Sequence, residues 1–149
     1  MVGFVLQFIG VRSVRLNVFA KLARKFGGVA MDFALSEEQQ AVYDMARSFG
    51  HEEIEPHAVE WDQAGYFPID VIKKTAELGL AGIYAKEEFG GSGLSRLDAT
   101  LVFEALAESC PSLSAFISIH NMVTWMVDSF GSHEQREKWV PQHVAMEKI

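Results

Sequence analysis

The sequence has very little cysteine, with Cys110 alone among 149 residues. A single cysteine excludes an internal disulfide and a cysteine-rich metal site. Long apolar runs are also missing, because the longest one, from Val2 to Val11, is interrupted by Gln7. A membrane-spanning helix needs about 20 predominantly apolar residues, so we expect no membrane span. The His-Glu pairs at positions 51 and 133 lack the second histidine of a His-Glu-x-x-His zinc motif, and we expect no metal site.

Acidic residues outnumber basic ones by 20 to 13, and the formal net charge is −7. The imbalance is uneven: residues 1–30 contain no acidic residue and carry +5, whereas residues 31–149 carry −12. A nucleic-acid surface needs a basic stripe, so we expect no nucleic-acid partner.

The first thirty residues differ in kind from the rest. They contain arginine, no acid and recurrent apolar residues, which is typical of a mitochondrial presequence. Their charges follow the apolar run, which argues against a secretory signal. A second interpretation is that Met31 is the true start and that residues 1–30 are an upstream extension. We expect residues 1–30 to lie outside the fold in both cases. The first interpretation predicts a location in the mitochondrial matrix, and the second predicts a bacterial cytoplasm.

Helix signals recur from residue 31 onward. Ser36 with Gln39 and Ser132 with Gln135 form capping boxes, which mark helix starts. No strand pair is convincing, and Leu80–Ala85 is a short apolar link that can be extended. The pattern predicts six helices: from Ser36 to about Ile54, through Trp61 to Gly65, from Pro68 to Gly79, from Ser95 to about Ser109, from about Ser112 to Phe130, and from Ser132 through Trp139.

The segment 112–130 is apolar nearly all round. A helix of that composition is typically central, with neighbours on every side. We therefore predict an all-α fold, an irregular up-and-down bundle of about six helices around this one.

A glycine cluster lies between two predicted helices, at Lys86-Glu87-Glu88-Phe89-Gly90-Gly91-Ser92-Gly93-Leu94. It has neither the Gly-Lys-Ser/Thr ending of a phosphate-binding P-loop nor the Gly-x-Gly-x-x-Gly dinucleotide fingerprint. Its two glutamates would repel an anion. The residues themselves indicate a plain turn that uses positive φ angles.

Three further residues have side chains that could take part in a site: His120, Asn121 and Cys110. His120 and Asn121 are polar and lie within the most apolar helix, where buried polar groups must find hydrogen-bond partners. They either line a cavity or are satisfied within the core, and for His120 we favour the core. Cys110 is interpreted as a small buried hydrophobe.

Three segments in order resemble the N-terminal domain of the acyl-CoA dehydrogenase family. They are the acidic glycine loop Glu88–Leu94, the helix around Phe103–Ala107, and Gly131–Trp139. The resemblance covers residues 31–149, which implies that this part is the helical N-terminal domain of such an enzyme. Within the family, Ser92–Asp98 and Ser118–Met122 look like the members that act on short branched acyl-CoA thioesters such as isobutyryl-CoA, in valine breakdown.

The resemblance also implies a cofactor and partners. Family enzymes use FAD to introduce an α,β double bond into an acyl-CoA substrate, pass electrons to an electron-transfer flavoprotein, and form homotetramers. This sequence ends at Ile149, where the family's flavin-contacting loop would begin. The catalytic glutamate, the middle β-domain and the C-terminal helical domain lie beyond that point. We therefore assign no catalytic or cofactor-binding residue, and expect the chain to be inactive alone and to bind no FAD.

By family position, the domain that is present covers one wall of the enzyme's acyl pocket. The resemblance assigns it to Ala115, Phe116, Ser118, Ile119 and Met122. Bulky side chains there would shorten the pocket and favour a short acyl group. An alternative function is a stand-alone helical protein-interaction module derived from the same domain.

Overall fold

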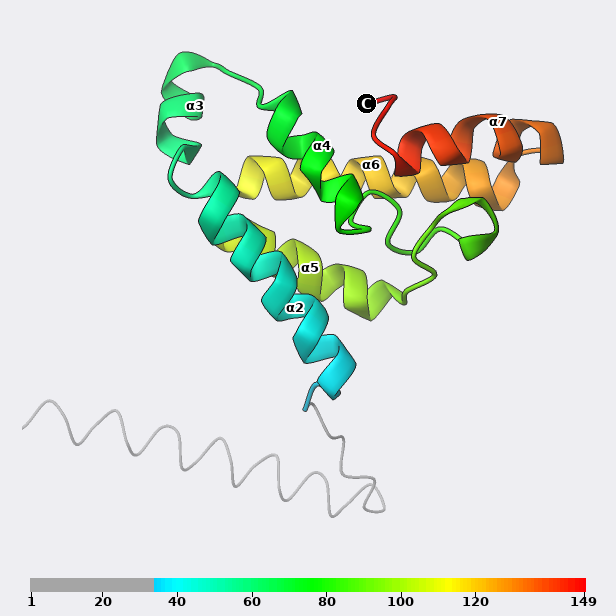
Figure 1. The fold of residues 1–149 in the computed structure, drawn as a ribbon, viewed down its shortest axis with the longest axis horizontal. Coiled ribbons are helices and arrows are strands. Elements are labelled where there is room, and N and C mark those ends of the chain that lie inside the picture. The colour runs from blue at the N-terminus through cyan, green and yellow to red at the C-terminus, as the bar shows by residue number, and fades with distance from the viewer. Residues whose placement is uncertain (1–33) are drawn as a thin grey trace, which may run out of the picture. The chain divides into compact units, whose positions relative to one another are not determined.

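The computed structural model describes residues 34–149, and this part contains six α-helices and no strand (Figure 1). The all-helical prediction is confirmed. The interpretations of residues 1–30 and of a start at Met31 lie outside the described residues. The helices are α2 (Glu37–Phe49), α3 (Ala58–Ala64), α4 (Ile69–Glu77), α5 (Arg96–Ser109), α6 (Pro111–Phe130) and α7 (His133–Val144), with a π-helical turn η1 (Gly50–Ile54) and a 3₁₀ turn η2 (Glu87–Phe89).

Serine caps start three of these helices. Ser36, Ser95 and Ser132 each accept a hydrogen bond from the backbone three residues later, and each forms a complete capping box. The first and last of these boxes confirm the sequence prediction. Proline occupies the first position of α6, where a missing N–H costs nothing because that group has no partner within the helix.

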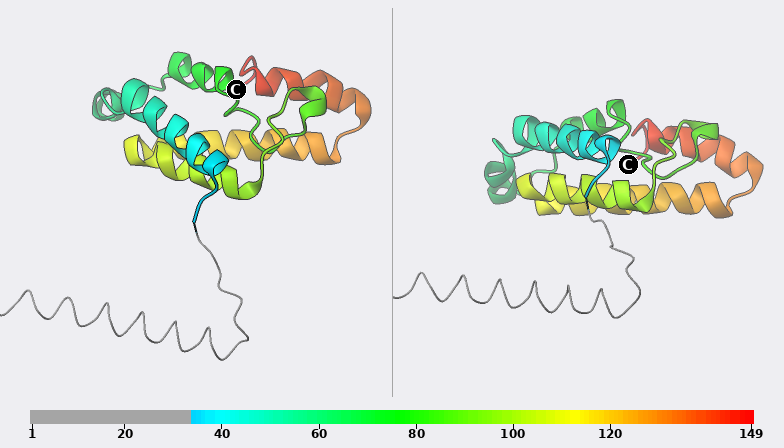
Figure 2. Two further views of the ribbon diagram at one scale, coloured as in Figure 1. Left: turned by 60° about the horizontal axis from the view of Figure 1, so that its bottom comes forward. Right: turned by 90° about the horizontal axis from the view of Figure 1, so that it is seen from below.

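The helices form two layers, with α5 and α6 in one and α2, α4 and α7 across the other (Figure 2). The core lies between them. It consists of aliphatic side chains contributed by most of the elements, including Ile54, Ile72, Leu80, Ile83, Val102, Leu106, Ile117 and Met146. Residues 35–149 form one compact unit.

Helix α6 does not have neighbours on every side, and that prediction is wrong. Its buried face carries five polar residues, Ser114, His120, Asn121, Thr124 and Asp128. Its other face exposes large apolar side chains: Ile119 is 55% exposed and Phe130 is 76% exposed. We call this surface the open face of α6; it comprises Ala115, Ile119, Met122, Val123, Met126 and Phe130.

The polar inner face of α6 holds the segment between α4 and α5. The Asn121 side chain accepts a hydrogen bond from the Ile83 N–H (2.7 Å) and donates to the Leu80 carbonyl oxygen (2.8 Å). Two turns further on, the Asp128 carboxylate accepts from the Lys86 N–H (3.1 Å). Residues 80–85 therefore form turns that side chains of α6 stabilise by hydrogen bonds, and they are not extended.

The glycines of this segment permit its turns. Gly90 and Gly93 have φ angles of 93° and 62°, which confirms the predicted use of positive φ. Gly91 is needed for a different reason, since an added Cβ would lie 2.3 Å from the Ala85 carbonyl oxygen.

Replacing Asn121 tests the role of this contact. Asn121→Leu keeps a similar volume but leaves the Ile83 N–H and the Leu80 carbonyl buried without their partner. Each orphaned group costs about 1–3 kcal/mol, so we expect the free energy of unfolding to fall by at least about 2 kcal/mol. Urea denaturation measures it. The matched control Met126→Leu, on the open face of the same helix, should change it by less than about 0.5 kcal/mol. Equal effects would contradict the assigned role.

Candidate functional site

The five residues predicted to face an acyl group lie on or beside the open face of α6. Ala115, Ser118, Ile119 and Met122 follow the spacing i, i+3, i+4 and i+7, which places them on one side of the helix. The Ser118 hydroxyl donates to the Ala115 carbonyl oxygen (2.7 Å), so it is satisfied within the helix. This side of α6 is therefore a mainly apolar surface.

Phe116 lies at the edge of that surface. Its ring is half-buried and meets the Phe67 ring edge-on, with centroids 5.0 Å apart. It also lies 6.4 Å from the His120 ring. Phe116 thus packs against the loop before α4 and against His120 of its own helix, and it borders the open face instead of forming part of it.

A cavity of about 260 Å³ borders the same region. Phe116, Ile119 and Val123 line it from α6, and His143, Lys148 and Ile149 line it from α7 and the residues after it. His120 completes the lining. The predicted wall residues Phe116 and Ile119 therefore belong to a cavity that also contains two imidazoles, a feature that sequence reasoning missed.

Both outcomes considered for His120 and Asn121 occur. Asn121 is satisfied in the core. His120 donates from Nε2 to the His143 carbonyl oxygen (2.9 Å) and also lines the cavity. Burial lowers the pKa of both His120 and His143 below the ordinary value, and for His143 the neighbouring His120 lowers it further. Both rings are thereby held toward the neutral form.

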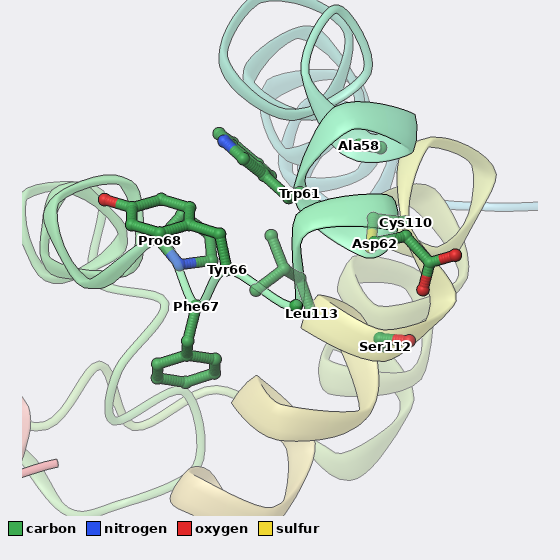
Figure 3. A pocket seen from close by; sticks show the side chains of 10 residues that line it. Ala58, Trp61, Asp62, Tyr66, Phe67, Pro68, Cys110, Ser112 and Leu113 are labelled. Atoms are coloured by element: carbon green, nitrogen blue, oxygen red, sulfur yellow. The ribbon is translucent and has the colours of Figure 1, made fainter.

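A second cavity, of about 180 Å³, lies between α3 and the start of α6 (Figure 3). Trp61, Tyr66 and Phe67 stand on one side of it, and Asp62 and Cys110 on the other. Cys110 is free and half-buried, so its interpretation as a buried hydrophobe is only partly correct. We find no unsatisfied polar group directed into this cavity among the described residues.

The amides in the glycine-containing part of the loop, residues 90–94, are not left for a phosphate. The N–H groups of residues 90–94 all donate to backbone carbonyl oxygens, at 2.8–3.1 Å. The nearby Glu88 carboxylate pairs with Arg136, whose guanidinium also meets the buried Asp128 carboxylate (3.3 Å). The loop therefore does not fit the pyrophosphate of a dinucleotide cofactor.

Within residues 34–149, no three His, Cys, Asp or Glu side chains gather closely enough to hold a metal ion. None of the helices in the same range has the length and apolar character to cross a membrane.

The family model that matches this chain is of acyl-CoA dehydrogenases, and the related sequences include acyl-CoA dehydrogenases. The family model described as acyl-CoA dehydrogenase, N-terminal domain, matches residues 36–147. The mitochondrial isobutyryl-CoA dehydrogenases of Bos taurus and Dictyostelium discoideum are 49% and 51% identical to this chain over 115 residues. The match covers 77% of this chain and 28% of each relative, so the chain spans less than a third of their length.

Solved structures share the fold. Butyryl-CoA dehydrogenase from Megasphaera elsdenii superposes with a TM-score of 0.73 at 29% identity, over 80% of this chain and 32% of that one. The FAD complex of PigA superposes with a TM-score of 0.75 at 30% identity, over the same shares of the two chains. Both likenesses place the described helices in the same architecture.

The imidazoles of His120, which is buried, and of His143, which is half-buried, predict a pH dependence of stability. Their pKa values are lower in the folded chain than in the unfolded one, near 6.5, so the unfolded chain binds more protons between those values. Stability is complete above about pH 6.5 and falls as the pH drops through the folded pKa values. We expect a lower Tm at pH 5.5 than at pH 7.5, measured by circular dichroism.

The double variant His120→Gln/His143→Gln should reduce this pH dependence. The control His133→Gln replaces an exposed histidine at the start of α7 and should leave it in place. An unchanged slope in the double variant would show that other groups cause the effect.

Proposed function

The chain belongs to the acyl-CoA dehydrogenase family and carries its N-terminal domain, and we propose that the open face of α6 forms one wall of the acyl pocket in such an enzyme. The observation that carries this proposal is the exposure of Ile119 and Met122, at 55% and 41%, on a helix whose other side buries His120, Asn121, Thr124 and Asp128. Monomeric proteins rarely expose a contiguous apolar patch without a ligand or partner for it.

The substrate that we propose is a short branched acyl-CoA such as isobutyryl-CoA, in valine breakdown. The relatives at 49% and 51% identity act on that acyl group by name. The bulk of Ile119 and Met122 supports a short group, because large side chains at a wall leave little depth for an acyl chain. Full burial of one such side chain contributes about 1.5–3 kcal/mol, enough for both to influence affinity.

We further propose that this chain alone is inactive and binds no FAD. The amides of residues 90–94 in the glycine loop are already hydrogen-bonded, and no aspartate or glutamate lines the cavity beside the open face of α6 to act as base. FAD would be held by the parts of the relatives beyond the matched segment. From the family we extend two further properties to the complete protein: electron transfer to an electron-transfer flavoprotein, and assembly as a homotetramer. If residues 1–30 act as a presequence, its location is the mitochondrial matrix.

A chimera tests the wall. Residues 34–149 replace the matched segment of the Dictyostelium enzyme, and Met122→Ala is introduced into the active product. Removing the side chain deepens the pocket, so we expect the ratio of kcat/KM for hexanoyl-CoA over isobutyryl-CoA to rise about tenfold. Steady-state kinetics with both substrates measures this ratio.

Leu97→Ala is the matched control, because Leu97 is an exposed apolar residue on α5 and not on α6. It should leave the ratio unchanged. An unchanged ratio in Met122→Ala as well would refute the wall. A chimera that folds but has no activity would instead favour the protein-interaction module, since the exposed apolar face would then serve a partner protein.

A further inference from the structure

The Phe116 ring, at the edge of the open face of α6, is supported by a residue from outside that helix. Phe116 is half-buried and lines the cavity of about 260 Å³ together with Ile119 and Val123. On another side it meets the Phe67 ring at an interplanar angle of 77°, with centroids 5.0 Å apart. Aromatic pairs prefer this edge-to-face geometry, because the positive edge of one ring meets the negative face of the other. The position of the Phe116 ring therefore depends on Phe67.

Phe67 belongs to a short loop between α3 and α4 whose backbone is fixed. The Tyr66 N–H donates to the Trp61 carbonyl oxygen (2.8 Å), and the Ile69 N–H donates to the Phe67 carbonyl oxygen (3.0 Å). The next residue, Pro68, is buried, and a proline restricts the conformation of the residue before it. The Phe67 and Tyr66 side chains leave this loop in different directions (Figure 3). The loop thus holds Phe67 in a defined position.

The surroundings of Phe67 leave space beside its ring. Phe67 is 44% exposed and lines the second cavity, of about 180 Å³. The contact between Phe67 and Phe116 therefore joins a residue that lines one cavity to a residue that lines the other. A smaller side chain at position 67 would give the Phe116 ring room to move away from Ile119.

We propose that Phe67 is a positioning residue for acyl specificity, because it holds the Phe116 ring beside Ile119, where that ring limits the width of the acyl pocket. This inference rests on the proposed function, in which the open face of α6 contacts the acyl group. Met122 limits the depth of the pocket, whereas the Phe116 ring limits the space beside the chain. A ring fixed there accepts a methyl branch and excludes a longer one.

The active chimera tests this inference with 2-methylbutyryl-CoA and isobutyryl-CoA, which differ by one methylene. One methylene in a hydrophobic pocket changes kcat/KM by about 10–200-fold. Phe67→Leu removes the supporting ring, so we expect the ratio of kcat/KM for 2-methylbutyryl-CoA over isobutyryl-CoA to rise at least about fivefold. Phe116→Leu should also raise this ratio. The double variant should raise it no further than Phe116→Leu alone, because Phe67 acts through that ring.

Tyr66→Leu is the matched control, because Tyr66 is the neighbouring exposed aromatic residue and packs against Trp61, with centroids 6.4 Å apart. It should leave the ratio unchanged. A variant that only destabilises the fold lowers kcat/KM for both substrates together, which also leaves the ratio unchanged. If Phe67→Leu does not fold, Phe67→Met replaces it, with the same expected result.

Two results would overturn the inference: an unchanged ratio in the folded Phe67 variant, or single effects of Phe67→Leu and Phe116→Leu that multiply in the double variant. The wall itself is tested separately by Met122→Ala. If Met122→Ala raises the hexanoyl-CoA ratio and the Phe67 variant changes nothing, the wall stands and the role of Phe67 is wrong. If neither variant changes its ratio, or if the folded chimera is inactive, both proposals are wrong.

Discussion

The orientation of α6 depends on hydrogen bonds between its polar inner face and the segment that links α4 to α5. Asn121 satisfies two backbone groups of that segment, and Asp128 satisfies a third. Rotating the helix to bury its apolar residues would leave these groups unpaired, at a cost of about 1–3 kcal/mol for each. The helix therefore keeps its polar side inward, and its large apolar side chains remain at the surface.

This orientation connects the fold to the proposed functions. A helix with Ile119, Met122 and Phe130 exposed offers a surface that a substrate or the remainder of an enzyme can cover. At its edge, the same helix meets α7 and the residues after it around two imidazoles and a lysine. The apolar wall and the cavity beside it thus share Ile119, but each has different neighbouring groups.

Much of the fold could be predicted because its signals are local. Capping boxes at Ser36 and Ser132 identify helix starts from residues three apart, and the glycine loop indicates its positive φ angles. The rotation of α6 could not be predicted, since a helix that is apolar nearly all round has no periodic face. Which polar residues turn inward depends on backbone groups about 40 residues away. His143 was missed for the same reason, because its partner His120 lies on another helix.

The central claim is that the open face of α6 contacts the acyl group in the complete enzyme. The most direct measurement is a crystal structure of the chimera, residues 34–149 joined to the rest of the Dictyostelium enzyme, with isobutyryl-CoA bound. We expect acyl carbons within about 4.5 Å of Ile119 or Met122, the range of an apolar contact. A structure in which protein side chains cover this face, with the acyl group bound elsewhere, would contradict it.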